Sequence, residues 1–355
     1  MKKYIPLLLA LPFFAGCLKD EPFKLEYNGF EPQAIQDDWQ LSTPEAENMD
    51  RDLLEQAYKL VYSDTRYTRA RSLLVFRNGK LVAEAYPNDP DDIDAIDNIQ
   101  SATKSITSIL TGIAIHEQLI DSTGEKLYDI YPEDFDTDLE KRSITIDDAL
   151  TMRTGLKYDN GTHTLELYQN EGNSVQYILS LDRIYPSGTV MNYNDGAPHL
   201  ISRVIEKKAG MSESEYAKTH LFDPLNIKDW KWEAAKDGTT FGAFSLFLKP
   251  RDFGKLGQLL LQQGQWQGEI LVDPAYLARA TSTLVSAHQG GQPYGYYFWI
   301  LPAMGGYYAS GHGGQFLLVV PDKHLVVVYT AWPYTSGEFF DRGFELMTLI
   351  GEACK

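Results

Sequence analysis

The sequence predicts an α+β fold: one antiparallel sheet flanked by terminal helices, with an inserted helical domain. Near the start, two strand-like runs, Ser72–Arg77 and Lys80–Tyr86, are separated by Asn78-Gly79, a dipeptide that strongly favours a two-residue hairpin turn. Helical patterns dominate the middle of the chain. Because strands need partner strands, we expect both ends of the chain to share one sheet. Four further strand-like runs lie near the end of the chain, at Tyr297–Leu301, Tyr307–Ser310, Phe316–Val320 and Leu325–Ala331.

The composition is that of a globular protein without a nucleic-acid partner. The chain has 355 residues, enough for one large or two ordinary domains, and 43% of them are hydrophobic. The formal net charge is −17, and no basic run is present beyond Lys2-Lys3. Since phosphate backbones are bound by clustered lysine and arginine, this charge argues against nucleic acid.

Residues 1–16 have the features of an export signal. Lys2-Lys3 gives a charged start, an apolar run follows, and Ala15-Gly16 provides the small residues that precede cleavage. The sequence Phe14-Ala-Gly-Cys17 resembles the lipoprotein box of bacteria. This resemblance implies that Cys17 is the lipid attachment site and that the protein is anchored in the cell envelope, on the outer membrane and facing the periplasm or the surface. The alternative is an ordinary signal peptide followed by an incidental cysteine.

Residues 17–41 are expected to form an acidic tether behind this lipid anchor, because they lack helical periodicity. The stretch Leu18-Lys-Asp-Glu21 resembles the acidic surface-export tag of lipoproteins in some Gram-negative bacteria. The only other cysteine is Cys354, so a disulfide framework and a C-x-x-C redox or zinc site are excluded.

Regular structure is expected from Ser42 onward, where a hydroxyl residue, a proline and two acids give the start signals of a helix. The chain then divides into a sheet domain of residues 42–100 and 245–355 and a helical domain of residues 101–244. The predicted first helix has an apolar stripe of Met49, Leu53, Ala57, Leu60 and Val61. Later helices are predicted at Ile144–Met152, His199–Ala209, Ser212–His220, Asp252–Gln262 and 337–350.

The helix expected from Ser101 onward carries the first chemical signal. Its apolar residues, which include Ile106 and Ile113, recur at the spacing of one helical face, and we expect the helix to be buried at the junction of the two domains. Ser101 stands at the start, where serine is a favoured cap, and Lys104 follows one turn later. A serine, a lysine and the positive end of a helix dipole together make an activated nucleophile. Alone, the pattern equally fits a capping serine with a solvated lysine.

Two further stretches supply polar side chains. Tyr193 follows the turn Pro186-Ser-Gly-Thr189, and a tyrosine close to a lysine can shuttle protons. His312 lies between glycines at the start of a predicted strand, where backbone N–H groups can approach a ligand. A packed tyrosine and a glycine-rich connection are the simpler alternatives. The sequence has no G-x-S-x-G elbow, no zinc-binding helix and no phosphate loop.

Taken together, Ser101-Ala-Thr-Lys104, Tyr193-Asn-Asp195 and His312-Gly-Gly314 resemble the three motifs of the serine β-lactamase-related family in order and rough spacing. That family includes class C β-lactamases, penicillin-binding DD-peptidases, family VIII esterases and 6-aminohexanoate-dimer hydrolases. Supporting similarities include Leu150–Leu156 and His220–Leu225, and the resemblance covers about residues 42–350.

The resemblance implies a β-lactamase/penicillin-binding-protein-like fold and hydrolysis of an ester or amide through a Ser101 acyl-enzyme. Lys104 and Tyr193 would take the serine proton between them. The backbone N–H groups of Ser101 and Gln315 would bind the oxyanion, and His312 would orient the tyrosine or the leaving group. The resemblance implies no metal and no organic cofactor. The substrate-binding residues it implies are Asp195, His312, Gly314 and Gln315.

Two departures from the family pattern bear on the substrate. Asp195 stands where the family usually has asparagine, and a carboxylate can accept but not donate a hydrogen bond. His312 stands where β-lactamases usually have lysine, and histidine binds a substrate carboxylate less well than a permanent cation. We therefore expect an esterase or amidase acting on a small ester, an amide or a short peptide. The alternatives are a DD-peptidase or β-lactamase, and a non-catalytic envelope binding protein on the same scaffold.

Overall fold

The computed structural model describes residues 25–286, 291–334 and 339–355. The predicted export signal 1–16, the lipid attachment residue Cys17 and the tag at Leu18–Glu21 lie outside these ranges. Among the helices in the described ranges, none has the length and apolar character needed to cross a bilayer.

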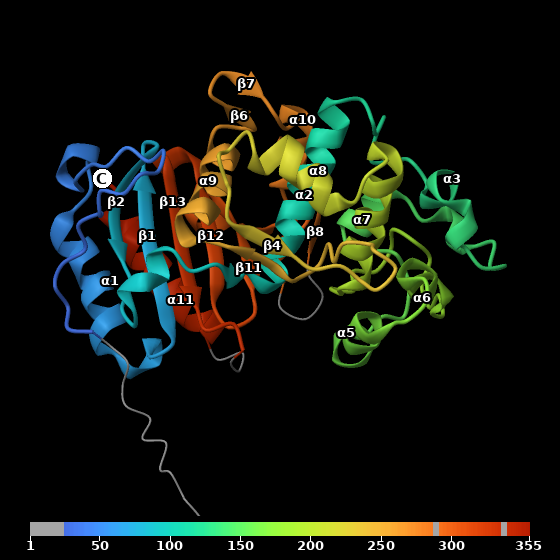
Figure 1. Ribbon diagram of the computed structural model, residues 1–355, viewed down its shortest axis with the longest axis horizontal. Coiled ribbons are helices and arrows are strands. Elements are labelled where there is room, and N and C mark those ends of the chain that lie inside the picture. The colour runs from blue at the N-terminus through green and yellow to red at the C-terminus, as the bar shows by residue number, and fades with distance from the viewer. Residues whose placement is uncertain (1–24, 287–290, 335–338) are drawn as a thin grey trace, which may run out of the picture.

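An antiparallel sheet in the order β2-β1-β13-β12-β11-β10-β9-β8 forms one half of the molecule (Figure 1). β1 pairs with β2 on one side and with β13 on the other, so both ends of the chain share this sheet, as predicted. The strands are β1 (Ala70–Arg77), β2 (Lys80–Ala85), β8 (Val285–Ser286), β9 (Pro293–Tyr294), β10 (Trp299–Leu301), β11 (Gly306–Gly311), β12 (Gln315–Val320) and β13 (Leu325–Ala331).

The hairpin between β1 and β2 closes at the predicted Asn78-Gly79 turn. Both residues have a backbone conformation in the left-handed region, with φ of 53° and 78°. A two-residue turn that matches the twist of its strands needs positive φ at both positions, which asparagine and glycine tolerate best.

Helices cover both faces of the sheet. On one face, α1 (Arg51–Ser63) and α11 (Phe339–Ala353) pack together, and Leu54 and Met347 join a core with Val75 and Val327. On the other face, α9 (Pro250–Leu261) packs against β12 and β13. Successive strand residues point to opposite faces, so Leu74 and Val326 belong to this second core.

The helical part lies beside the sheet, with α2 at the junction between them (Figure 1). Every residue of α2 from Thr103 to Ala114 is buried, as expected for a helix covered on both faces. It packs against α7, α8, α10 and β11. The helices are α2 (Thr103–His116), α3 (Leu127–Ile130), α4 (Ile146–Leu150), α5 (Asn160–Gln169), α6 (Ser174–Ser180), α7 (Gly196–Ala209), α8 (Glu213–Ala217) and α10 (Pro274–Ala280).

Short strands complete the fold. β3 (Asp97–Asn98), β5 (Leu246–Leu248) and β4 (Trp230–Trp232) form a second sheet, and β6 (Gln265–Trp266) pairs with β7 (Glu269–Ile270). Two- and three-residue strands have no alternating pattern long enough to detect, and the sequence analysis did not predict them.

Two expectations about the N-terminal region need correction. The first helix begins at Arg51 with Asp50 as its cap, whereas Glu45–Glu47 forms only a 3₁₀ turn. Its buried face consists of Leu54, Ala57, Tyr58 and Val61. Ordered contacts also begin before Ser42: Phe30, which was placed in the tether, is 1% exposed and its carbonyl accepts a hydrogen bond from Glu84 N.

Candidate active site

Ser101 lies in a 3₁₀ turn, Gln100–Ala102, that leads directly into α2. The turn is held by a hydrogen bond from Ile99 N to Leu246 O, and Gln100 has a positive φ of 51°. The sequence analysis expected Ser101 to cap the helix. Instead α2 begins at Thr103, and the Ser101 hydroxyl accepts a hydrogen bond from Lys104. The serine oxygen therefore contacts the lysine rather than the helix end.

Lys104 is 1% exposed, and its ammonium group has three acceptors. Its Nζ lies 2.8 Å from Ser101 Oγ, 2.7 Å from Asp195 Oδ1 and 3.1 Å from the carbonyl oxygen of Ala243. Burial on its own lowers the pKa of Lys104, but the charge of Asp195, followed by the effect of Tyr193, raises that pKa above its ordinary value. The lysine is therefore a cation in this arrangement.

Tyr193 lies in the loop before α7, with its ring against the lysine. Lys104 Nζ is 5.0 Å from the ring centroid. On the other side, the ring of Trp299 is 5.5 Å away and that of Tyr294 is 6.1 Å away. The half-buried tyrosine is thus fixed between a cation and an aromatic wall.

Asp195 is held by a helix that the sequence analysis missed. Its Oδ2 accepts a hydrogen bond of 2.6 Å from Thr164 Oγ1, and its backbone N–H donates to Asn160 Oδ1 at 2.9 Å. Thr164 and Asn160 lie on α5, which is polar and only weakly amphipathic. Their contacts span 31 and 35 residues, so no local spacing indicated them.

The hairpin between β11 and β12 carries the third motif. His312 is exposed, whereas Gly314 and Gln315 are buried. The Gln315 side chain is fully buried, and its amide donates to the carbonyl of Ala331. Gly311, just before the motif, lies against the segment that leads to Ser101.

Ser101, Tyr193 and His312 line one cavity of about 440 Å³. The other predicted site residues, Lys104, Asp195, Gly314 and Gln315, are not among its lining residues. Among the aromatic residues of the last strands, Trp299 and Tyr308 line the cavity, whereas Tyr294, Tyr296, Tyr297 and Tyr307 belong to the hydrophobic core.

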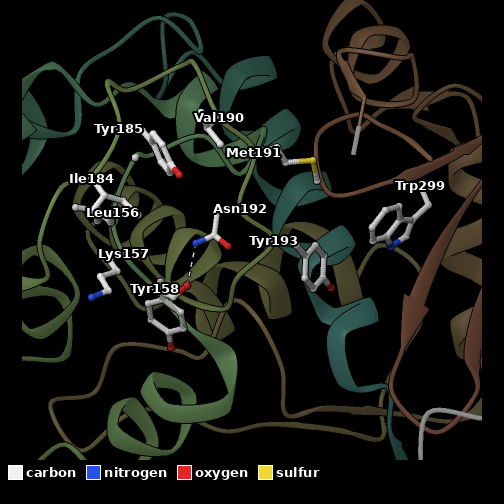
Figure 2. Close-up of a pocket in the computed structure, with 11 residues that line it drawn as sticks. Leu156, Lys157, Tyr158, Ile184, Tyr185, Val190, Met191, Asn192, Tyr193 and Trp299 are labelled. Atoms are coloured by element: carbon white, nitrogen blue, oxygen red, sulfur yellow. Dashed lines mark hydrogen bonds between the residues drawn. The ribbon is translucent and has the colours of Figure 1, made fainter. Parts of the chain in front are cut away.

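A second cavity of about 520 Å³ adjoins the first, because Tyr193 and Trp299 line both. Figure 2 shows Tyr193 and Trp299 at one side and Leu156, Ile184 and Tyr185 at the other. Asn192 lies between them and donates to the carbonyl of Tyr158 at 2.8 Å (Figure 2). The two cavities together make an extended groove that starts at Ser101.

No group of three or more histidine, cysteine, aspartate or glutamate side chains suited to a metal ion occurs in the part of the chain that the structure describes. The polar side chains that line the cavity include Ser101, Tyr193 and His312, and the ammonium group of Lys104 contacts Ser101 from behind the cavity. An antiparallel sheet, a helical part and a serine–lysine pair at the start of the buried helix between them define the class of active-site serine hydrolases of the β-lactamase, penicillin-binding-protein and esterase type.

The chain belongs to the Beta-lactamase family, whose family model matches residues 62–349. No curated protein gives a significant sequence match.

Several solved structures share the fold. A Bacillus anthracis protein named after 6-aminohexanoate-dimer hydrolase is 18% identical, with a TM-score of 0.72 over 93% of this chain and 91% of its own. A family VIII carboxylesterase is 16% identical, with a TM-score of 0.69 over 85% of this chain and 97% of its own. A penicillin-binding protein homologue from Caulobacter crescentus is 13% identical, with a TM-score of 0.62 over 79% of this chain and 91% of its own.

Proposed function

We propose that the protein cleaves an ester or amide bond through a covalent acyl-enzyme on Ser101. The observation that supports this most directly is the 2.8 Å contact between Lys104 Nζ and Ser101 Oγ, at a cavity that Ser101 lines. A serine hydroxyl is a weak nucleophile, and a charged neighbour that stabilises its alkoxide makes it reactive.

The proposed reaction has two halves. Ser101 Oγ attacks the substrate carbonyl and loses its proton to the Lys104–Tyr193 pair, while the leaving group takes that proton as the carbonyl re-forms. Water then attacks the acyl-enzyme and releases the acid. The backbone N–H groups of Ser101 and Gln315 would stabilise the oxyanion in both halves. A buried Gln315 side chain is compatible with this role, because only its backbone is needed.

We further propose a neutral acyl substrate, as an ester, an amide or a short peptide. Within the described residues, the cavity that Ser101 lines includes neither lysine nor arginine, whereas the exposed Lys157 lines the adjoining second cavity. Lys104 lies behind Ser101 and is already paired with Asp195, so a neutral acyl group suits the cavity beside Ser101 better than an anionic one. Apolar walls contributed by Trp299 and Tyr308 suit an uncharged acyl group.

The test is Ser101→Ala in the purified protein, assayed with p-nitrophenyl butyrate and with a fluorophosphonate probe. We expect hydrolysis to fall by at least about 10³-fold and labelling to disappear. Ser108→Ala is the matched control, because Ser108 lies on the same buried helix but contacts Tyr276 instead of the cavity. Full activity in Ser101→Ala would refute the proposal. A wild-type protein that binds a fluorescent penicillin reversibly and never forms an adduct would favour the binding-protein alternative.

We also propose that Cys17 carries a lipid that anchors the protein in the cell envelope. The support is the sequence Phe14-Ala-Gly-Cys17 after an apolar run. Mass spectrometry of the mature N-terminus, with Cys17→Ser as the comparison, tests this. An unmodified Cys17 in the mature protein would contradict it.

A further inference from the structure

We propose that a second site, separate from the groove at Ser101, binds a neutral sugar unit of a carbohydrate. The site is a cavity of about 390 Å³ between α9, the β1–β2 turn, the β6–β7 hairpin and the segment of residues 38–40. Among the described residues, those that line this cavity are distinct from those that line either cavity of the groove. Binding there is therefore independent of the acyl-enzyme chemistry at Ser101.

Side-chain amides and tryptophans dominate the lining, and we call this site the amide cavity. Its two tryptophans are Trp39 and Trp266, and in the described part of the chain no leucine, isoleucine, valine or methionine lines it. A sugar ring has apolar C–H faces and a rim of hydroxyls. Aromatic rings pack against the C–H faces, whereas amides, which both donate and accept, bind the hydroxyls. The five amide residues of the cavity are Gln40, Asn78, Gln258, Gln262 and Gln267.

Two buried polar atoms at the amide cavity lack a hydrogen-bond partner among the described residues: Oε1 of Gln258 and Nε1 of Trp266. Gln258 is 6% exposed, and its amide lies beside the β1–β2 turn, because a Cβ atom added to Gly79 would stand 3.5 Å from Gln258 Nε2. A buried polar group without a partner costs free energy, which a ligand recovers by pairing with it.

The two atoms need opposite partners, and this need narrows the class of ligand. Gln258 Oε1 accepts a hydrogen bond, whereas Trp266 Nε1 donates one. An ionised phosphate or carboxylate only accepts, and an ammonium group only donates. A hydroxyl does both, so a ligand with several hydroxyls satisfies both atoms. A peptide backbone also does both, but peptides are recognised through pockets for their side chains, and the described lining of the amide cavity offers no aliphatic wall for one.

The charged residues at the amide cavity are already paired, which favours an uncharged ligand. Lys255 is 3% exposed, and its Nζ lies 3.0 Å from Asp252 Oδ1 and 3.6 Å from Asp38 Oδ2. Lys80 Nζ lies 2.7 Å from Glu47 Oε1. An anionic ligand would have to compete with these carboxylates for the two lysines.

Local structure fixes the walls of the amide cavity before any ligand binds. Trp39 Nε1 donates to the carbonyl of Arg251 at 3.1 Å, and the Trp39 ring packs on Phe76 with the ring centroids 4.2 Å apart. Gln258 lies on α9, which packs beside β6, and Gln262 follows one turn later at the C-terminal cap (Figure 1). Walls that are fixed in advance lower the entropy cost of binding.

The test is an NMR titration of the purified protein with four neutral tetrasaccharides: cellotetraose, maltotetraose, xylotetraose and chitotetraose. The ¹⁵Nε1–H signal of Trp266 is assigned by its absence in Trp266→Phe. We expect at least one tetrasaccharide, at up to about 10 mM, to move this signal in the direction of a hydrogen-bonded indole and to saturate. If none of the four moves it, the proposal is wrong.

Two further probes distinguish other classes of ligand. Inorganic phosphate and tetra-alanine are titrated over the same concentrations, and we expect neither to move the Trp266 signal. A shift with phosphate or tetra-alanine and with no sugar would overturn the proposed class. A sugar that binds without moving the Trp266 signal lies elsewhere on the protein, and that result would overturn the proposed site.

Gln258→Leu separates binding from packing, because it removes the buried acceptor and keeps an apolar side chain of similar size. We expect sugar affinity to fall about five- to tenfold, the effect of one lost hydrogen bond, while Tm stays the same or rises because an unpartnered polar group is removed. Trp266→Phe should weaken binding similarly, and it covers the case in which Gln258→Leu does not fold. Wild-type affinity in both variants would contradict the proposal.

Trp230→Phe is the matched control, because Trp230 is also partly buried on a short strand but packs against Phe222 and does not line the amide cavity. We expect it to bind sugar as the wild type does, and an equal loss would show that the effect of Trp266→Phe is not specific. Ser101→Ala should also bind sugar normally, and Trp266→Phe should hydrolyse p-nitrophenyl butyrate at the wild-type rate. Loss of ester hydrolysis thus bears on the proposed function, whereas loss of sugar binding bears on the amide cavity alone.

Discussion

Gly311 lies so close to Ile99 that a Cβ atom added to the glycine would stand 2.1 Å from the Ile99 carbonyl oxygen. This contact joins the end of β11 to the segment immediately before Ser101. The same added atom would stand 3.0 Å from the Cβ atoms of Gln100 and Gln315. The glycine therefore sets the separation between the nucleophile and the hairpin that carries His312.

Gly311→Ala should displace one of these two segments. Overpacking of this kind costs about 1–3 kcal/mol, and we expect kcat/KM for a p-nitrophenyl ester to fall at least tenfold because Ser101 moves relative to the hairpin. Gly124→Ala is the control, since its Cβ would meet only Ser122 Oγ at an ordinary 3.5 Å. An active, equally stable Gly311→Ala protein would show that the contact does not position the serine.

A second prediction concerns Glu213, a fully buried carboxyl at the start of α8. Within the described residues its two oxygens have no hydrogen-bond partner. Burial raises the pKa of Glu213 to about 8. In the folded protein the Glu213 carboxyl is therefore neutral at pH 7, whereas in the unfolded chain it is ionised at any pH above the ordinary pKa of a glutamate carboxyl.

At any pH between the ordinary glutamate pKa and about 8, folding is therefore coupled to the uptake of a proton by Glu213. As the pH rises through this window, the free energy of unfolding should fall by on the order of 3–5 kcal/mol in total for this group, and it should level off above the window. Glu213→Gln should be increasingly more stable than the wild type from pH 5 to pH 8 in urea unfolding. A constant difference between the two proteins across this range would contradict the shifted pKa.

Much of the scaffold follows from local patterns in the sequence. The Asn78-Gly79 hairpin, the apolar run of β13 and the end of α7 at Ala209 were all predicted, because each depends on neighbouring residues. The motif residues Ser101 and Lys104 are one helical turn apart, and their contact was also predicted.

What could not be predicted depends on contacts between distant residues. The carbonyl of Ala243 that binds Lys104 is 139 residues away, and Thr164 reaches Asp195 from a polar helix without a clear apolar face. The local environment of Ser101 was also mistaken. Ser101 was expected to cap the helix, whereas α2 begins at Thr103 and the serine hydroxyl contacts Lys104 instead.

A third prediction concerns the second cavity. Ile184 and Tyr185 line it and are 50% and 45% exposed, so both present apolar surface to a group that occupies the cavity. Ile184→Ser should lower kcat/KM for octanoate esters about five- to tenfold, the value of one lost apolar contact, and leave acetate esters unchanged. Ile270→Ser is the control, because Ile270 is 41% exposed on β7 and does not line the groove. Equal effects on both chain lengths would place the acyl group elsewhere.

The last prediction concerns the preference for neutral esters over β-lactams. His312 is exposed and lines the cavity of Ser101, where a substrate carboxylate would need a cation. Histidine is not a permanent cation, whereas lysine is charged throughout the neutral range. The carboxylate of Asp195 adds negative charge behind the serine, although Lys104 balances it.

A buried charge pair with a substrate anion contributes on the order of 2–5 kcal/mol, so its absence should strongly disfavour anionic substrates. We therefore expect kcat/KM for p-nitrophenyl butyrate to exceed that for nitrocefin by tenfold or more in the wild type. His312→Lys should raise the nitrocefin value about tenfold and change the butyrate value less than twofold, because the neutral ester has no charge to pair. If the wild type instead prefers nitrocefin by tenfold or more, or if His312→Lys changes both substrates equally, then the charge at this position does not set the preference.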